Sequence, residues 1–164
     1  MIRSCRILVI GVGNRYRSDD AAGLLAADLL KSAQIQEVHV VTGITDGASM
    51  IDLWQGYEAV YVVDAVVSGE EPGKIYRFDA ASGTVPKSFF NPYSTHSFSV
   101  AEAIQLAFAL DKLPANLIVY GIEAKNFEQG EHVSPDVAAA VSVVAGKIID
   151  ETRVELNRVV ERLR

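Results

Sequence analysis

Apolar strands alternate with amphipathic helices along this chain, and few folds accommodate that order. Residues 7–13 form a β-branched run that ends in glycine, which is typical of a strand buried on both faces, and a helix over 19–33 follows. Ser18 or Asp19 is available to cap that helix, and its leucines, Leu29 among them, predict a buried stripe. The other predicted strands are 38–41, 59–67, 73–78 and 117–122, and the other predicted helices are 46–54, 97–110 and 135–163.

This order predicts an α/β fold in three layers (α/β/α), in which a mostly parallel five-stranded sheet has helices on both faces. The stretch 73–78 alternates apolar and charged residues, so we expect it to be a half-exposed edge strand. No repeat, linker or change of composition divides the 164 residues, and we therefore expect a single domain over 1–164.

Composition excludes several classes of protein. The formal net charge of −6 lacks the basic balance of a general nucleic-acid binder, so we expect no nucleic-acid partner. The early apolar run is too short for a signal peptide or a membrane span, so we expect no membrane association. Cys5 is the only cysteine, which rules out an intramolecular disulfide and a cysteine zinc site. These features together predict a soluble protein of the reducing cytoplasm.

Three polar residues are expected at the carboxyl edge of the sheet, where ligands bind in folds of this class. Asp64 ends the most hydrophobic strand, and a carboxylate buried there needs a partner, a proton or a metal ion. Asp20 lies at the start of the first helix, where an acidic residue also interacts favourably with the helix dipole. His96 directly precedes another helix, whereas His39 and His132 have no such support and are interpreted as structural.

These residues are compatible with two kinds of chemistry. Two carboxylates and one imidazole can bind a metal ion and leave positions open for water or substrate. Alternatively, the two carboxylates can share a proton and activate water, as paired aspartates do. A dinucleotide site is disfavoured, because Gly11-Val-Gly13 has Tyr16 in place of the third glycine and Thr42-Gly43 in place of an acidic residue. We therefore interpret the glycines as a tight turn between strand and helix.

The segment from Gly11 to Gly23 contains the string Gly-Val-Gly-Asn-Arg-Tyr-Arg-Ser-Asp-Asp-Ala-Ala-Gly. It resembles the opening motif of the hydrogenase maturation endopeptidases, the HyaD/HybD/HycI-type peptidases of nickel–iron hydrogenases. The resemblance continues in order through Val62-Val-Asp64-Ala65, Pro72-Gly73, Ser94-Thr-His96, Gly121-Ile-Glu123 and Ser134-Pro-Asp-Val137. It thus spans nearly the whole chain, although the charged ending after residue 150 contains no motif of that family.

The resemblance implies a hydrolase that removes a C-terminal peptide from the large-subunit precursor of a nickel–iron hydrogenase once nickel has been inserted. It implies that Asp20, Asp64 and His96 are both catalytic and metal-contacting. Nickel would be supplied by the precursor, and zinc or cadmium would replace it in crystals. The family often has glutamate at the position of Asp20, so the shorter side chain here would draw the metal nearer the helix.

Two other functions are weighed against this one. Peptidyl-tRNA hydrolases share a glycine-asparagine turn after the first strand, but they need a histidine where this chain has Ser18-Asp19-Asp20. They also need a basic face for tRNA, which the net charge of −6 disfavours. The third possibility is a metal- or nucleotide-sensing module that cuts no peptide bond.

Overall fold

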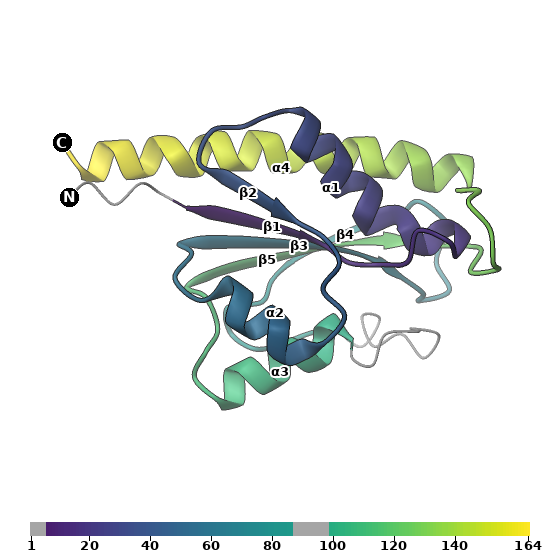
Figure 1. The fold of residues 1–164 in the computed structure, drawn as a ribbon, viewed down its shortest axis with the longest axis horizontal. Helices are drawn as coiled ribbons and strands as arrows, with labels where there is room; N and C mark the ends of the chain where they lie inside the picture. The colour runs from purple at the N-terminus through teal and green to yellow at the C-terminus, as the bar shows by residue number, and fades with distance from the viewer. Residues whose placement is uncertain (1–5, 87–98) are drawn as a thin grey trace.

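The computed structural model describes residues 6–86 and 99–164, which contain five strands and five helical segments (Figure 1). The strands are β1 (Ile7–Gly11), β2 (Val38–Val41), β3 (Ala59–Val66), β4 (Ile75–Asp79) and β5 (Asn116–Glu123). The helical segments are the 3₁₀ turn η1 (Ser18–Ala21) and the helices α1 (Ala22–Ser32), α2 (Gly47–Trp54), α3 (Val100–Ala109) and α4 (Pro135–Arg162). None of the helices in the two described ranges is long and apolar enough to cross a membrane.

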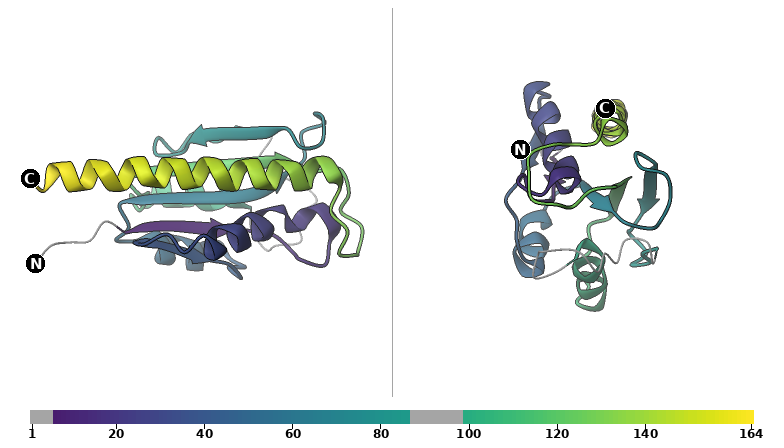
Figure 2. Two further views of the ribbon diagram at one scale, coloured as in Figure 1. Left: turned by 90° about the horizontal axis from the view of Figure 1, so that it is seen from above. Right: turned by 90° about the vertical axis from the view of Figure 1, so that its right-hand side faces the viewer.

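The five strands form one sheet in the order β2-β1-β3-β5-β4. β4 runs antiparallel to β5, and the other neighbouring strands are parallel. Helices α1 and α4 pack together on one face of this sheet, whereas α2 and α3 cover the other face (Figure 1, Figure 2). The predicted three-layer α/β/α fold with a mostly parallel five-stranded sheet is therefore confirmed.

The position of β1 between two layers of helices explains why its sequence is apolar without interruption. All of its residues are buried. Ile7 and Val9 belong to the core shared with α1 and α4, whereas Leu8 and Ile10 belong to the core shared with α2 and α3. Because successive side chains of a strand point to opposite faces, a strand covered on both sides contributes to both cores.

Residues close together in the sequence also determine the edge strand and the start of α2. β4 lies at the edge of the sheet with its residues half-buried or exposed, as its alternating sequence predicts. Asp46 caps α2 by accepting a hydrogen bond of 2.8 Å from the backbone N–H of Ser49. Helix α3 begins at Val100, where Ser99 and Glu102 form a reciprocal capping box, and the predicted start at residue 97 lies outside the described residues.

The first helix differs from the prediction. Residues 18–21 form the 3₁₀ turn η1, and α1 begins only at Ala22. Ser18 has a φ of 53°, and no side chain caps either segment. Leu29, expected in the buried stripe, is 44 % exposed, because the buried face of α1 consists mainly of alanine and glycine. Small residues on this face let the helix lie close to the sheet.

The close approach is made by two glycines that face each other. A Cβ atom on Gly23 would overlap the backbone carbonyl oxygens of Val12 and Val63. A Cβ atom on Gly11 would overlap the carbonyl oxygen of Gly23 and lie 2.7 Å from the Cβ of Ala27. The glycines of the opening motif therefore bring the start of α1 against the carboxyl ends of β1 and β3.

We expect Gly23→Ala to lower the free energy of unfolding by about 3 kcal/mol, because backbone atoms of two strands must move to admit the methyl group. The matched control is Gly146→Ala in the exposed part of α4, where the new Cβ meets no atom within 4 Å. That change should raise the free energy of unfolding by up to ~1 kcal/mol. Urea unfolding measures both, and similar effects of the two substitutions would contradict the proposed close packing.

Candidate active site

Asp64 and Asp20 lie at the same edge of the sheet. Asp64 is near the carboxyl end of β3, paired in register with Gly121 of β5. Asp20 is 4 % exposed on η1. The contact of Gly23 with the carbonyl oxygen of Val63 holds the segment that carries Asp20 beside the end of β3. The structure thus brings together the two carboxylates that the sequence analysis singled out.

The environment of Asp64 favours its protonated form. Burial raises the pKa of the Asp64 carboxyl well above its usual range, and the negative charge of Asp20 raises the pKa further. A hydrogen bond from the backbone N–H of Ala65 opposes these effects only in part. Two carboxylates placed in this way are stabilised by a shared proton or by a cation. Both kinds of chemistry considered for the sequence need this arrangement.

The cationic side chain of Arg17 lies beside Asp20. Its Nη1 atom lies 4.0 Å from Oδ2 of Asp20. Its guanidinium also stacks on Phe127, with 5.8 Å between the guanidinium carbon and the ring centroid. The positive charge of Arg17 therefore offsets part of the negative charge of the carboxylate pair.

Asp19 has a role that differs from that of its neighbour Asp20. It is fully buried, and its carboxylate accepts hydrogen bonds from the backbone N–H groups of Lys125 (2.9 Å), Asn126 (2.9 Å) and Ser134 (2.7 Å), and from the Ser134 hydroxyl (2.8 Å). Burial alone would raise the pKa of Asp19, but these hydrogen bonds outweigh it and lower the pKa. Asp19, one of the two residues available to cap the first helix, instead anchors the loop after β5 and the start of α4.

Glu123 anchors the turn after β3 in a similar way. This side chain is 1 % exposed, and it accepts hydrogen bonds from the backbone N–H groups of Ser68 (2.8 Å), Gly69 (3.0 Å) and Glu70 (3.2 Å). The Ser68 hydroxyl donates a further bond of 2.8 Å. Glu123 was not predicted as a functional or anchoring residue, although it ends the apolar strand β5 much as Asp64 lies near the end of β3.

His96 lies outside the described residues, so the geometry of the predicted trio stays a prediction. Within residues 6–86 and 99–164, no three histidine, cysteine, aspartate or glutamate side chains are grouped so that they could hold a metal ion. His39 is exposed on β2, and its Nδ1 atom lies 2.8 Å from the hydroxyl of Tyr57. Asp20 and Asp64 are thus the two described members of the candidate site.

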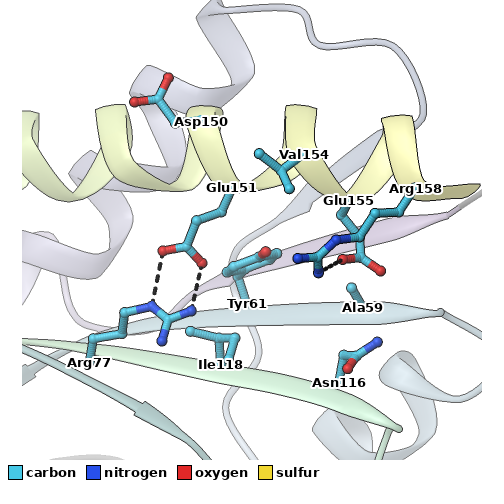
Figure 3. Close-up of a pocket in the computed structure, with 10 residues that line it drawn as sticks. All are labelled: Ala59, Tyr61, Arg77, Asn116, Ile118, Asp150, Glu151, Val154, Glu155 and Arg158. Carbon is cyan, nitrogen blue, oxygen red and sulfur yellow. Dashed lines mark hydrogen bonds and ion pairs between the residues drawn. The ribbon is translucent and has the colours of Figure 1, made fainter.

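A cavity of about 350 Å³ lies at the opposite end of β3, under the second half of α4 (Figure 3). Within it, Nε and Nη2 of Arg77 on β4 each lie 3.0 Å from a carboxylate oxygen of Glu151. The hydroxyl of Tyr120 donates to the same carboxylate. This network fastens α4 to β4 and β5. Because Tyr61 and Ala59 line the cavity near the start of β3, it is separate from the site at Asp64.

Comparison with known proteins decides the family. A family model described as hydrogenase maturation protease matches residues 24–151, which is more than half of the chain. The chain belongs to the hydrogenase maturation protease family. Members of this family are hydrolases, and this assignment disfavours the peptidyl-tRNA hydrolase alternative. The family model begins after Asp20 and extends across Asp64 and residue 96.

Individual relatives agree with this family. The hydrogenase 2 maturation protease of Escherichia coli K12 is 25% identical over 151 residues, which cover 90% of this chain and 91% of that protein. The structure of the hydrogenase maturating endopeptidase HybD from E. coli matches with a TM-score of 0.77, at 22% identity, over 92% of this chain and 93% of that one. The HybD hydrogenase maturation protease from Thermococcus kodakarensis matches with a TM-score of 0.65, at 26% identity, over 90% and 98%.

Proposed function

We propose that this protease removes a C-terminal peptide from the nickel-loaded large-subunit precursor of a nickel–iron hydrogenase, and that Asp20, Asp64 and His96 are its catalytic and nickel-contacting residues. The observation that carries the proposal is the carboxylate pair at the carboxyl edge of the sheet, in which burial, and after it the charge of Asp20, raises the pKa of Asp64. Burial favours a proton on such a carboxyl, and charge repulsion favours a proton or a cation, as is common at functional sites.

The donor set fits the metal that the substrate would deliver. Two carboxylate groups and an imidazole form a mixed set of hard and borderline ligands, which accepts nickel, zinc or cadmium. In this proposal nickel arrives as part of the precursor, so the protease needs no metal ion of its own. Bound between enzyme and precursor, the ion would orient the scissile bond next to the two aspartates.

Two routes to cleavage remain within the proposal. In one, Asp64 shares a proton with Asp20, and the ionised partner removes a proton from the attacking water. In the other, the metal ion supplies Lewis-acid activation, and the aspartates hold it in place. The pKa of Asp64 above its usual range favours the first route, because a protonated carboxyl can donate its proton to the leaving amine.

The proposed compartment is the cytoplasm, in agreement with the single cysteine of the sequence. A precursor whose nickel is held by thiolates would be kept reduced there. Fractionation of the producing cells measures where the protein and the precursor are found.

The test of this function uses the precursor with and without nickel. We expect wild-type protein to cut only the nickel-loaded form, and mass spectrometry of the products should reveal a shortened large subunit and a released C-terminal peptide. We expect His96→Ala to weaken binding of the nickel-loaded form roughly ten- to hundredfold, which corresponds to ~1.4–2.8 kcal/mol for a lost ligand. Binding of the nickel-free form should change little.

Two results would contradict parts of this proposal. Equal binding of both precursor forms to the wild-type protein would exclude nickel as the link between enzyme and substrate, and would leave the trio as ordinary hydrolytic residues. Nickel-dependent binding without any cleavage would favour the metal-sensing module that cuts no peptide bond.

A further inference from the structure

Arg17 is held beside the carboxylate pair by contacts from two sides. The guanidinium lies 4.0 Å from Asp20 and stacks on Phe127 at 5.8 Å. The backbone of Arg17 forms a parallel bridge with Gly130, in the same loop that Asp19 anchors. Because the side chain of Arg17 is only 23 % exposed, its charge is less screened by water than a charge on the surface.

A second arginine in the loop between β1 and η1 provides a comparison. Arg15 lies two residues earlier, and its Nη1 atom is 2.9 Å from Oδ2 of Asp28 on α1. That pair is exposed, with 44% of each side chain accessible. The two arginines thus have the same charge and nearly the same position in the sequence, but only Arg17 faces the candidate site.

A fixed guanidinium affects free and bound nickel in opposite ways. Arginine stays protonated in proteins, so its positive charge repels a free divalent ion that approaches Asp20. Nickel that is already held by anionic ligands of a precursor has a neutral or negative total charge. The same guanidinium does not repel such a complex, and it attracts the complex when its charge is negative.

We propose that Arg17 is a specificity-determining residue, which lowers the affinity of Asp20 and Asp64 for free divalent metal ions and favours nickel already held by anionic ligands of the precursor. The proposal rests on the proposed function, in which these aspartates contact the nickel of the substrate. Arg17 would thereby give the protease a means to distinguish loaded precursor from free metal ions, and this means requires no separate regulatory domain.

The test is calorimetric titration of Ni²⁺ alone into the full-length protein and its variants. We expect Arg17→Gln to bind free Ni²⁺ roughly tenfold more tightly than the wild type, a change of ~1.4 kcal/mol. Arg17→Lys keeps the charge and should bind Ni²⁺ like the wild type. Arg15→Gln removes the same charge from the exposed pair with Asp28, and it should also leave the affinity unchanged. Thermal unfolding with Ni²⁺ gives a second readout of binding.

A titration of nickel-loaded precursor completes the test. Here Arg17→Gln should bind more weakly than the wild type, opposite in direction to its effect on free Ni²⁺. Unchanged affinity for free Ni²⁺ in Arg17→Gln, or no measurable binding by either protein, would overturn the inference about Arg17. If Asp20→Asn and Asp64→Asn bind Ni²⁺ as the wild type does, the proposed metal-contacting role of the aspartates fails instead.

Discussion

Replacing Asp64 by asparagine should abolish processing of the nickel-loaded precursor while the protein stays folded. Asparagine has nearly the same shape, but it can neither donate nor accept the proton of a carboxyl group, and it is a poor ligand for nickel. Loss of a general acid or base slows a reaction by at least about a hundredfold. Product analysis by mass spectrometry measures the loss. Asp52→Asn, on the exposed side of α2, is the matched control and should process normally.

The same substitution should leave the melting temperature unchanged or raise it. The pKa of Asp64 is raised in the folded protein, first by burial and then by the charge of Asp20. Folding therefore favours the protonated carboxyl, and the stability of the wild type falls as the pH rises from the ordinary aspartate pKa through the folded value. Asp64→Asn removes the charge and should flatten this part of the pH profile. Thermal unfolding across the pH range measures both effects.

A large loss of stability in Asp64→Asn would contradict this view of the site. It would mean that the charged carboxylate of Asp64 supports the fold, as Asp19 does, and the functional interpretation of Asp64 would weaken. Normal processing by a folded Asp64→Asn protein would exclude Asp64 from the reaction.

The largest loss of stability is expected for Asp19→Ala. The substitution leaves the backbone N–H groups of Lys125, Asn126 and Ser134 without their buried carboxylate acceptor. A hydrogen bond to a charged group contributes about 1.5–3 kcal/mol, so we expect the free energy of unfolding to fall by about 3–5 kcal/mol. Urea unfolding followed by circular dichroism measures the change. Processing should be lost together with the fold.

The neighbouring residue provides the control for this prediction. Asp20→Asn should change the free energy of unfolding by at most about 1 kcal/mol, because it weakens one long ion pair and relieves the repulsion with Asp64. It should nevertheless prevent processing. Similar stability of Asp19→Ala and Asp20→Asn would show that Asp19 does not anchor the loop after β5.

Acid unfolding distinguishes the two aspartates further. The pKa of Asp19 is lowered in the folded protein, because its hydrogen bonds outweigh the effect of burial. Its stabilising contribution is therefore fully present above the ordinary aspartate pKa and is lost as the pH falls through the folded value. Asp19→Ala should lack this acid-dependent part of the stability, whereas Asp20→Asn should keep it.

The sequence alone determined the features that depend on neighbouring residues. The apolar run of β1 predicted a strand buried on both faces, and the runs of β3 and β5 predicted strands. The alternation in β4 predicted an edge strand. The cap of α2 by Asp46 was predictable, because its partner Ser49 is only three residues away. Strands that alternate with helices then left an open α/β sheet as the fold, with Asp20 and Asp64 at its carboxyl edge.

Only the tertiary structure showed that Asp19 anchors a distant loop rather than capping the first helix. The hydrogen-bond partners of Asp19 lie 106 to 115 residues further along the chain, and the partner Ser68 of Glu123 lies 55 residues away. No local pattern reports such pairs, since they depend on how the loops meet after the sheet has formed. The stacking of Arg17 on the ring of Phe127 has the same origin. The turn that directs Asp19 towards the loop after β5 also directs Arg17 towards Asp20 and the ring of Phe127.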